Sequence, residues 1–101
     1  MRTPKPIKIA GYTIPVVMKK NLKVGGINAL GCYQYVNPKI TLNNHMTGQE
    51  KAHTLLHEAI HAVDRLYGIG LKESQIARLE VGMGDLIVNN PSLVKELAFK
   101  K

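Results

Sequence analysis

The chain has 101 residues, of which 45% are hydrophobic and 21% charged, a balance typical of one compact domain with a modest core. No apolar run approaches the length of a membrane span, and the single cysteine, Cys32, excludes an internal disulfide. The N-terminal stretch is interrupted by lysine and proline and makes a poor secretory signal, so we expect a soluble cytoplasmic protein without membrane contact.

The net charge of +7 is unevenly distributed along the chain. Residues 1–49 contain seven lysines and arginines and no acidic residue, whereas residues 50–101 contain seven basic and seven acidic residues. Such asymmetry favours an acidic substrate or a partner such as nucleic acid. A basic surface that serves solubility alone is the alternative.

The first half of the chain is predicted to form a small β-sheet after a loose tail over residues 1–6. Gly11 is expected to bend the first strand, and Pro15 favours an edge position. A glycine-containing loop over 19–30 follows, and Asn37-Pro38 is expected to turn the chain between two strands that pair antiparallel. The predicted strands are residues 7–18, 32–36 and 39–42.

The second half shows helical periodicity. Thr47 and Glu50 have the spacing of a capping box, and Asn90-Pro91 has the form of a second helix start. Gly82 and Gly84 each cost about 1 kcal/mol relative to alanine inside a helix, and close packing against the first helix would compensate. The predicted helices are residues 47–67, 72–89 and 91–99. One α+β domain over 1–101 is therefore expected, with a three-stranded sheet (7–43) packed on a helical hairpin and a short final helix.

The first predicted helix contains the motif HExxH, from His57 to His61. Two histidines four residues apart share one helix face, so both imidazoles can bind a single zinc ion. Glu58 projects beside the metal, where it can accept a proton from a zinc-bound water as general base. The alternative is a pair of surface histidines with an unrelated glutamate.

A catalytic zinc ion usually has a third protein ligand besides a water molecule. Ligands at positions 57, 61 and 64 would spread over ~10 Å of helix, so Asp64 is expected to support the site or to make a surface salt bridge. Glu73 and Glu80 lie seven residues apart on one face of the returning helix, and periodicity does not separate them. A simple antiparallel hairpin places Glu80 level with the middle of the motif, which favours Glu80.

Four features occur in order along residues 40–95: His57 to Asp64 in the form HExxHAxD, a glycine-containing turn at 67–71, the segment from Glu73 to Ile76, and Asn90-Pro91. Together they resemble the ImmA/IrrE-type small zinc metallopeptidases, and especially short HExxH proteins of phages and prophages. The resemblance implies a minimal zincin-like fold with one zinc ion per chain.

The resemblance to these gluzincin-type sites also implies that Glu73 is the third ligand, and Glu80 is kept as the alternative. An Asn or Asp often follows the metal glutamate by four residues in such sites, and here that position is Ala77. The resemblance further implies a phage or prophage protein that acts in the host cytoplasm on one specific protein substrate.

Other polar residues surround the motif in the sequence. His53 is expected at the rim of the cleft as a polar surface residue. The alternatives are that it stabilises an oxyanion or binds metal together with His57, a pairing that would lack a correctly placed base. His45 precedes the helix and could approach the mouth of the cleft. Cys32 is expected to be a small core residue, and Tyr33 and Tyr35 to pack on the sheet.

The favoured hypothesis is a zinc metallopeptidase in which His57, His61 and Glu73 bind the metal, Glu58 is the base, and an extended peptide adds to the sheet edge. The alternative is a basic module that binds nucleic acid or protein and has a structural or vestigial metal site. Its support is the charge of residues 1–49; against it stand the scarcity of aromatic residues and the lack of a known nucleic-acid motif. The oligomeric state is left open, although a short domain could bury additional apolar surface in a dimer.

Overall fold

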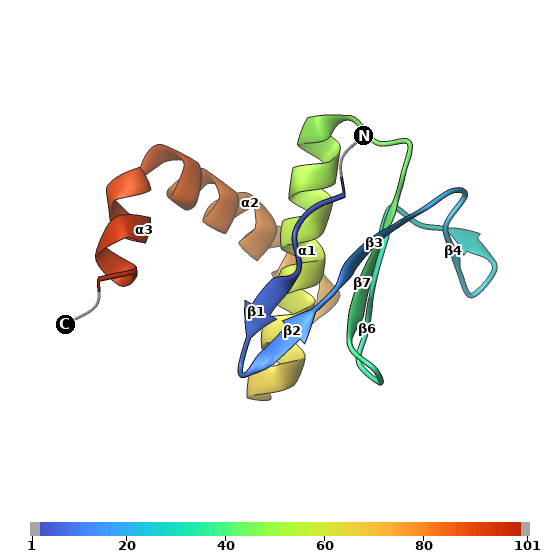
Figure 1. The fold of residues 1–101 in the computed structure, drawn as a ribbon, viewed down its shortest axis with the longest axis horizontal. Coiled ribbons are helices and arrows are strands. Elements are labelled where there is room, and N and C mark those ends of the chain that lie inside the picture. The colour runs from blue at the N-terminus through green and yellow to red at the C-terminus, as the bar shows by residue number, and fades with distance from the viewer. Residues whose placement is uncertain (1–2, 100–101) are drawn as a thin grey trace.

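A computed structural model describes residues 3–99, so the first two residues of the expected tail lie outside the described residues. Within this range the chain has an α+β fold of small sheets and helices (Figure 1). In chain order the elements are β1 (Ile7–Ile9), β2 (Tyr12–Ile14), β3 (Val16–Lys19), β4 (Lys23–Val24), β5 (Ile27–Asn28), β6 (Gly31–Gln34), β7 (Lys39–Asn43), α1 (Gly48–Tyr67), α2 (Glu73–Asn89) and α3 (Pro91–Leu97).

The segment 7–18, predicted as one bent strand, forms three strands. Ala10 and Gly11 have φ values of 52° and 79°, the left-handed conformation that a two-residue hairpin turn requires. The bend is therefore a complete reversal, and β1 pairs antiparallel with β2. After Pro15 the chain continues as β3 in a different sheet, where β3 is an edge strand as the proline indicates.

The main sheet has the strand order β3-β7-β6. β6 and β7 pair antiparallel, which confirms the pairing predicted for the last two strands, while β3 and β7 pair parallel. The predicted turn at Asn37-Pro38 connects β6 to β7, and Asn37 adopts a positive φ of 52° there. The predicted loop over 19–30 also contains a small hairpin, β4–β5, that projects beyond the main sheet (Figure 1).

One face of the main sheet packs against α1 to form the core. Ile40 and Leu42 alternate along β7 and are fully buried, because side chains two residues apart point to the same face of a strand. The buried core residues are Ile14, Val16, Ile40, Leu42, Met46 and Ala62. This packing fixes α1 beneath β6, the strand that borders the HExxH motif.

The helices begin close to the predicted residues. Thr47 and Glu50 form the predicted capping box at the start of α1, and Gly68 ends the helix with a φ of 62°. The expected close packing of the α2 glycines on α1 holds only for Gly84, where an added Cβ would lie 3.5 Å from His53 Cε1. It is wrong for Gly82, because that residue faces open space. α3 ends at Leu97, two residues before the predicted end.

In the part of the chain that the structure describes, no helix combines the length and the apolar character needed to cross a membrane.

Candidate metal centre

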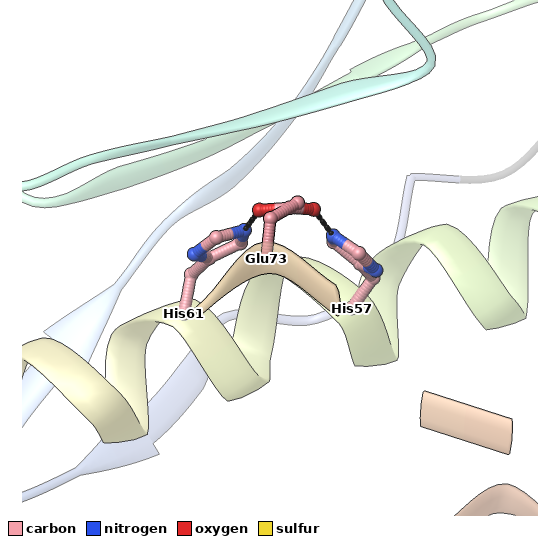
Figure 2. Close-up of side chains that lie close together, drawn as sticks. All are labelled: His57, His61 and Glu73. Carbon is pink, nitrogen blue, oxygen red and sulfur yellow. Dashed lines mark hydrogen bonds and ion pairs between the residues drawn. The ribbon is translucent and has the colours of Figure 1, made fainter. Parts of the chain in front are cut away.

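His57, His61 and Glu73 come together between α1 and the first turn of α2 (Figure 2). Glu73 Oε1 lies 2.6 Å from His57 Nε2, and Glu73 Oε2 lies 3.0 Å from His61 Nε2. The two imidazole rings are 5.1 Å apart in an edge-to-face arrangement. The carboxylate therefore bridges the same nitrogen of both histidines of the motif, as Figure 2 shows.

The turn between α1 and α2 explains how Glu73 reaches this position. Asp64 Oδ1 accepts hydrogen bonds from the backbone N–H groups of Gly70 at 2.7 Å and Leu71 at 2.8 Å. Gly68 and Gly70 both have positive φ values, 62° and 84°, which allow the tight reversal. Asp64 thus supports the site through the turn, and no ion pair of its carboxylate with another residue of the range 3–99 is seen.

Glu80 lies on the other side of His57. Glu80 Oε1 is 2.9 Å from His57 Nδ1, and Glu80 Oε2 is 3.2 Å from His53 Nδ1. A carboxylate on the second ring nitrogen is a common partner of a metal-binding histidine, and it fixes the orientation of the ring. The two glutamates that periodicity could not separate therefore occupy different positions: Glu73 faces both Nε2 atoms, and Glu80 faces Nδ1 of His57.

Glu73 and Glu80 occupy different positions because α1 and α2 cross obliquely. Figure 1 shows α2 crossing α1 at an angle instead of running alongside it. A simple antiparallel hairpin, with the two helices side by side, would have placed Glu80 over the middle of the motif and Glu73 beyond its end. With the crossing, the first turn of α2 lies over the histidine face, and the next turns reach the neighbouring face, where Glu80 meets His53 and His57.

His57 is placed between two carboxylates. Burial is the largest single influence on its pKa and lowers it, but the hydrogen bonds to Glu80 and Glu73 more than compensate, so the pKa of His57 is raised. Both of its ring nitrogens can donate to these carboxylates only in the imidazolium form. The surroundings of His57 therefore favour a positive charge at this point.

Glu58 lies against β6 of the sheet and is only 8% exposed. Burial raises the pKa of its carboxyl group, although the nearby His61 and His57 lower it in part. Sequence reasoning missed Gly31, which makes this burial possible: a Cβ there would lie 3.2 Å from Glu58 Cγ and 2.7 Å from Thr54 Cγ2. The signal in the sequence was a glycine at the start of a strand, which often marks close approach of another segment.

The residues fit a zinc ion by their chemistry. The possible ligand atoms of His57, His61 and Glu73 all lie within 4.8 Å of one another. Two imidazole nitrogens and one carboxylate are a common protein donor set of a catalytic zinc site, which keeps one position open. A cavity of about 310 Å³ adjoins the cluster and is lined by Leu30, Gly31, Thr54, His57, Glu58, Glu73 and Glu80.

A second, more open hollow of about 550 Å³ lies on the other side of His61. Arg65 is on its α1 side, and its guanidinium carbon lies 3.9 Å from the centre of the Tyr35 ring, within the range of a cation–π interaction. Tyr33 packs against the core as expected, whereas Tyr35 lies just past the end of β6 and is held by Arg65.

The structure corrects the expectation for Cys32 and places His45, whose position the sequence left open. Cys32 is half-buried instead of being in the core, because it pairs with Thr41 on the face of the sheet opposite to Ile40 and Leu42. His45 lines a separate hollow with Asn43 and does not border the metal cluster.

Comparisons with known protein families, with curated proteins and with solved structures give no match. The function of the chain is therefore argued from the geometry of its own residues.

Proposed function

We propose that the protein is a zinc-dependent metallopeptidase with a minimal zincin-like fold, similar to the ImmA/IrrE-type enzymes. One observation carries the proposal: the Nε2 atoms of both HExxH histidines face the carboxylate of Glu73, and a second carboxylate, Glu80, fixes the ring of His57. His57, His61 and Glu73 would hold the zinc ion. When bound, zinc would polarise the scissile carbonyl group and lower the pKa of a water molecule.

Glu58 is the proposed general base. It borders the cavity next to the cluster, and its raised pKa makes its carboxylate a better proton acceptor than an ordinary exposed glutamate. In this role Glu58 takes a proton from the attacking water and passes it to the leaving amine. The adjacent cavity is the proposed place of the reacting carbonyl group.

The proposed substrate is an extended segment of one specific protein. β6 is an edge strand beside α1, so a peptide can pair with its backbone over the HExxH motif. Arg65, in the hollow next to His61, would favour an acidic side chain of that peptide. The resemblance further suggests a phage or prophage protein that acts in the cytoplasm of the host cell.

Zinc content tests the metal site directly. We expect about one zinc ion per chain after exhaustive dialysis of the wild type. His57→Ala and Glu73→Ala should abolish zinc binding, whereas Glu80→Ala should weaken it about 10–100-fold without abolishing it. Loss of zinc with Glu80→Ala but not with Glu73→Ala would reverse the two roles, and a folded wild type that takes up no zinc would contradict the proposal.

Peptide cleavage then tests the activity. The zinc-loaded wild type should cleave members of a proteome-derived peptide mixture, and Glu58→Gln, which keeps the metal ligands, should not. The alternative function, a basic module for nucleic acid or protein, is motivated by the seven cationic side chains of residues 1–49. Salt-dependent DNA binding that is equal in wild type and Glu58→Gln, without cleavage of any peptide, would favour that alternative.

A further inference from the structure

The α2–α3 segment, residues 73–99, is here named the helical arm. It exposes more apolar side chains than the rest of the described chain: of eighteen large hydrophobic residues that are exposed, ten belong to it. They are Leu79, Val81, Met83, Leu86, Ile87, Val88, Leu93, Val94, Leu97 and Phe99. Val88 and Leu97 are the most exposed of them, at 79% each. α2 crosses α1 obliquely, so the later part of α2 and the whole of α3 extend away from α1 (Figure 1).

α3 is the least supported element of the helical arm. It has seven residues, none of them buried, and its contacts in the described part of the chain are mainly with α2. In Figure 1 it projects on the side of α2 remote from the sheet. A helix of this length has little stability of its own, so its apolar residues Leu93, Val94 and Leu97 need a surface to pack against.

The chain as a whole exposes more surface than a compact monomer of its mass. The chain exposes 7369 Å², whereas a compact monomer of 11.2 kDa exposes about 5,700 Å². Its radius of gyration, 14.0 Å, also exceeds the value of about 12.7 Å expected for its length. The excess of about 1,700 Å² is in the range that each subunit buries in a stable, obligate homodimer.

The distribution of charge makes the helical arm a less repulsive contact between two copies than the sheet would be. Residues 1–49 carry the whole net charge of +7, so two copies would repel each other if their sheets met. The helical arm has two basic residues, Arg78 and Lys95, and four acidic ones, a net charge of −2. It lies on the opposite side of α1 from the β4–β5 hairpin and the main sheet (Figure 1). Two arms can therefore meet while the basic halves of the chains point apart.

We propose that the protein is a two-fold symmetric homodimer in which the helical arms of two copies pack on each other through Val88, Leu97 and their apolar neighbours. A two-fold interface uses the same surface on both subunits, and the apolar residues of α2 and α3 provide such a surface. The proposal does not depend on the metal site, because Val88 and Leu97 are not among its residues.

Molar mass by light scattering or sedimentation, across a range of concentrations, tests the proposal on the full chain. The wild type should have twice the 11.2 kDa mass of one chain. Val88→Glu and Leu97→Glu should each weaken self-association roughly 30-fold or more, because each buries a charge at the centre of the contact. Ile27→Glu is the matched control: it places the same charge on a residue of β5 that is 74% exposed, and the dimer should persist.

A wild type with the mass of one chain at every concentration would overturn the proposal, whatever the variants do. A larger assembly would overturn the two-fold arrangement, and equal dissociation by Ile27→Glu would assign the interface to another surface. Circular dichroism checks that each variant keeps its helices. If one arm variant fails to fold, the other still tests the surface.

Discussion

Replacing Gly31 with alanine should destabilise the protein, because β6 touches α1 at this residue. An added Cβ would lie 2.7 Å from Thr54 Cγ2 and 3.2 Å from Glu58 Cγ. Ordinary contact begins at 3.4 Å, so the new Cβ and Thr54 Cγ2 must move apart by about 0.7 Å, the difference between 3.4 and 2.7 Å. Overpacking of this kind costs about 1–3 kcal/mol, which lowers the melting temperature of a domain of this size by roughly 4–24 °C.

A double-mutant cycle in the metal-free protein identifies the atoms responsible. Thr54→Ser removes the Cγ2 methyl group that the new Cβ would meet most closely. The double variant should therefore lose less free energy of unfolding than the two single variants lose in total, by at least about 0.5 kcal/mol. Gly48→Ala is the control, since a Cβ there meets nothing within 4 Å. Thermal and denaturant unfolding followed by circular dichroism give the free energies.

In the Gly31→Ala protein, any movement of β6 away from α1 should also change the pKa of Glu58. Because the carboxyl group of Glu58 is buried against β6, a strand that moves outward admits water and reduces the burial that raises its pKa. A Gly31→Ala protein within about 0.5 kcal/mol of the wild type would refute the close approach of β6 to α1. Strictly additive effects in the cycle would show that Thr54 is not the obstructing residue.

Further substitutions test individual contacts. Glu58→Gln should raise the melting temperature of the metal-free protein at neutral pH, since burial raises the pKa of Glu58 and its charged form is the costly one. This advantage should vanish as the pH falls below the ordinary carboxyl value of 4.5, and a less stable variant at pH 7 would contradict the burial of the charge. Asp64→Ala should cost about 1–3 kcal/mol in denaturant unfolding and weaken zinc binding, because Gly70 and Leu71 lose their acceptor; unchanged zinc affinity would show that the turn does not position Glu73. Gly82→Ala should stabilise the protein by about 1 kcal/mol in the same assay, and a loss of stability would show that Gly82 does not face open space. Arg65→Ala should reduce the cleavage of peptides with acidic residues more than that of neutral ones, as measured by mass spectrometry of a peptide mixture, and an equal loss for both would exclude a role in recognising acidic side chains.

Features encoded within one segment could be predicted from the sequence. The capping box of Thr47 and Glu50 and the periodic spacing over the next turns locate α1, because both depend on residues three or four apart. The same periodicity places His57 and His61 on one face. The antiparallel pair of β6 and β7 could also be predicted, because two short strand patterns flank a turn at Asn37-Pro38 and lie close together in the sequence.

Contacts between segments that lie far apart in the sequence could not be predicted. Cys32 was expected in the core, but the register with β7 places it on the opposite face, and register depends on which side of the sheet α1 covers. The parallel pairing of β3 with β7 and the contact of Gly31 with Thr54 also depend on how the chain returns.

From the sequence alone, a glutamate of the returning helix could be predicted to lie against the HExxH face. The sequence did not determine the positions of Glu73 and Glu80, because residues seven apart share a helix face and periodicity is the same for both. Those positions follow from the turn that the Asp64 hydrogen bonds stabilise and from the oblique crossing of α2 over α1. Periodicity specifies which side of one helix is buried, whereas the angle and position of its neighbour depend on the packing of the whole domain.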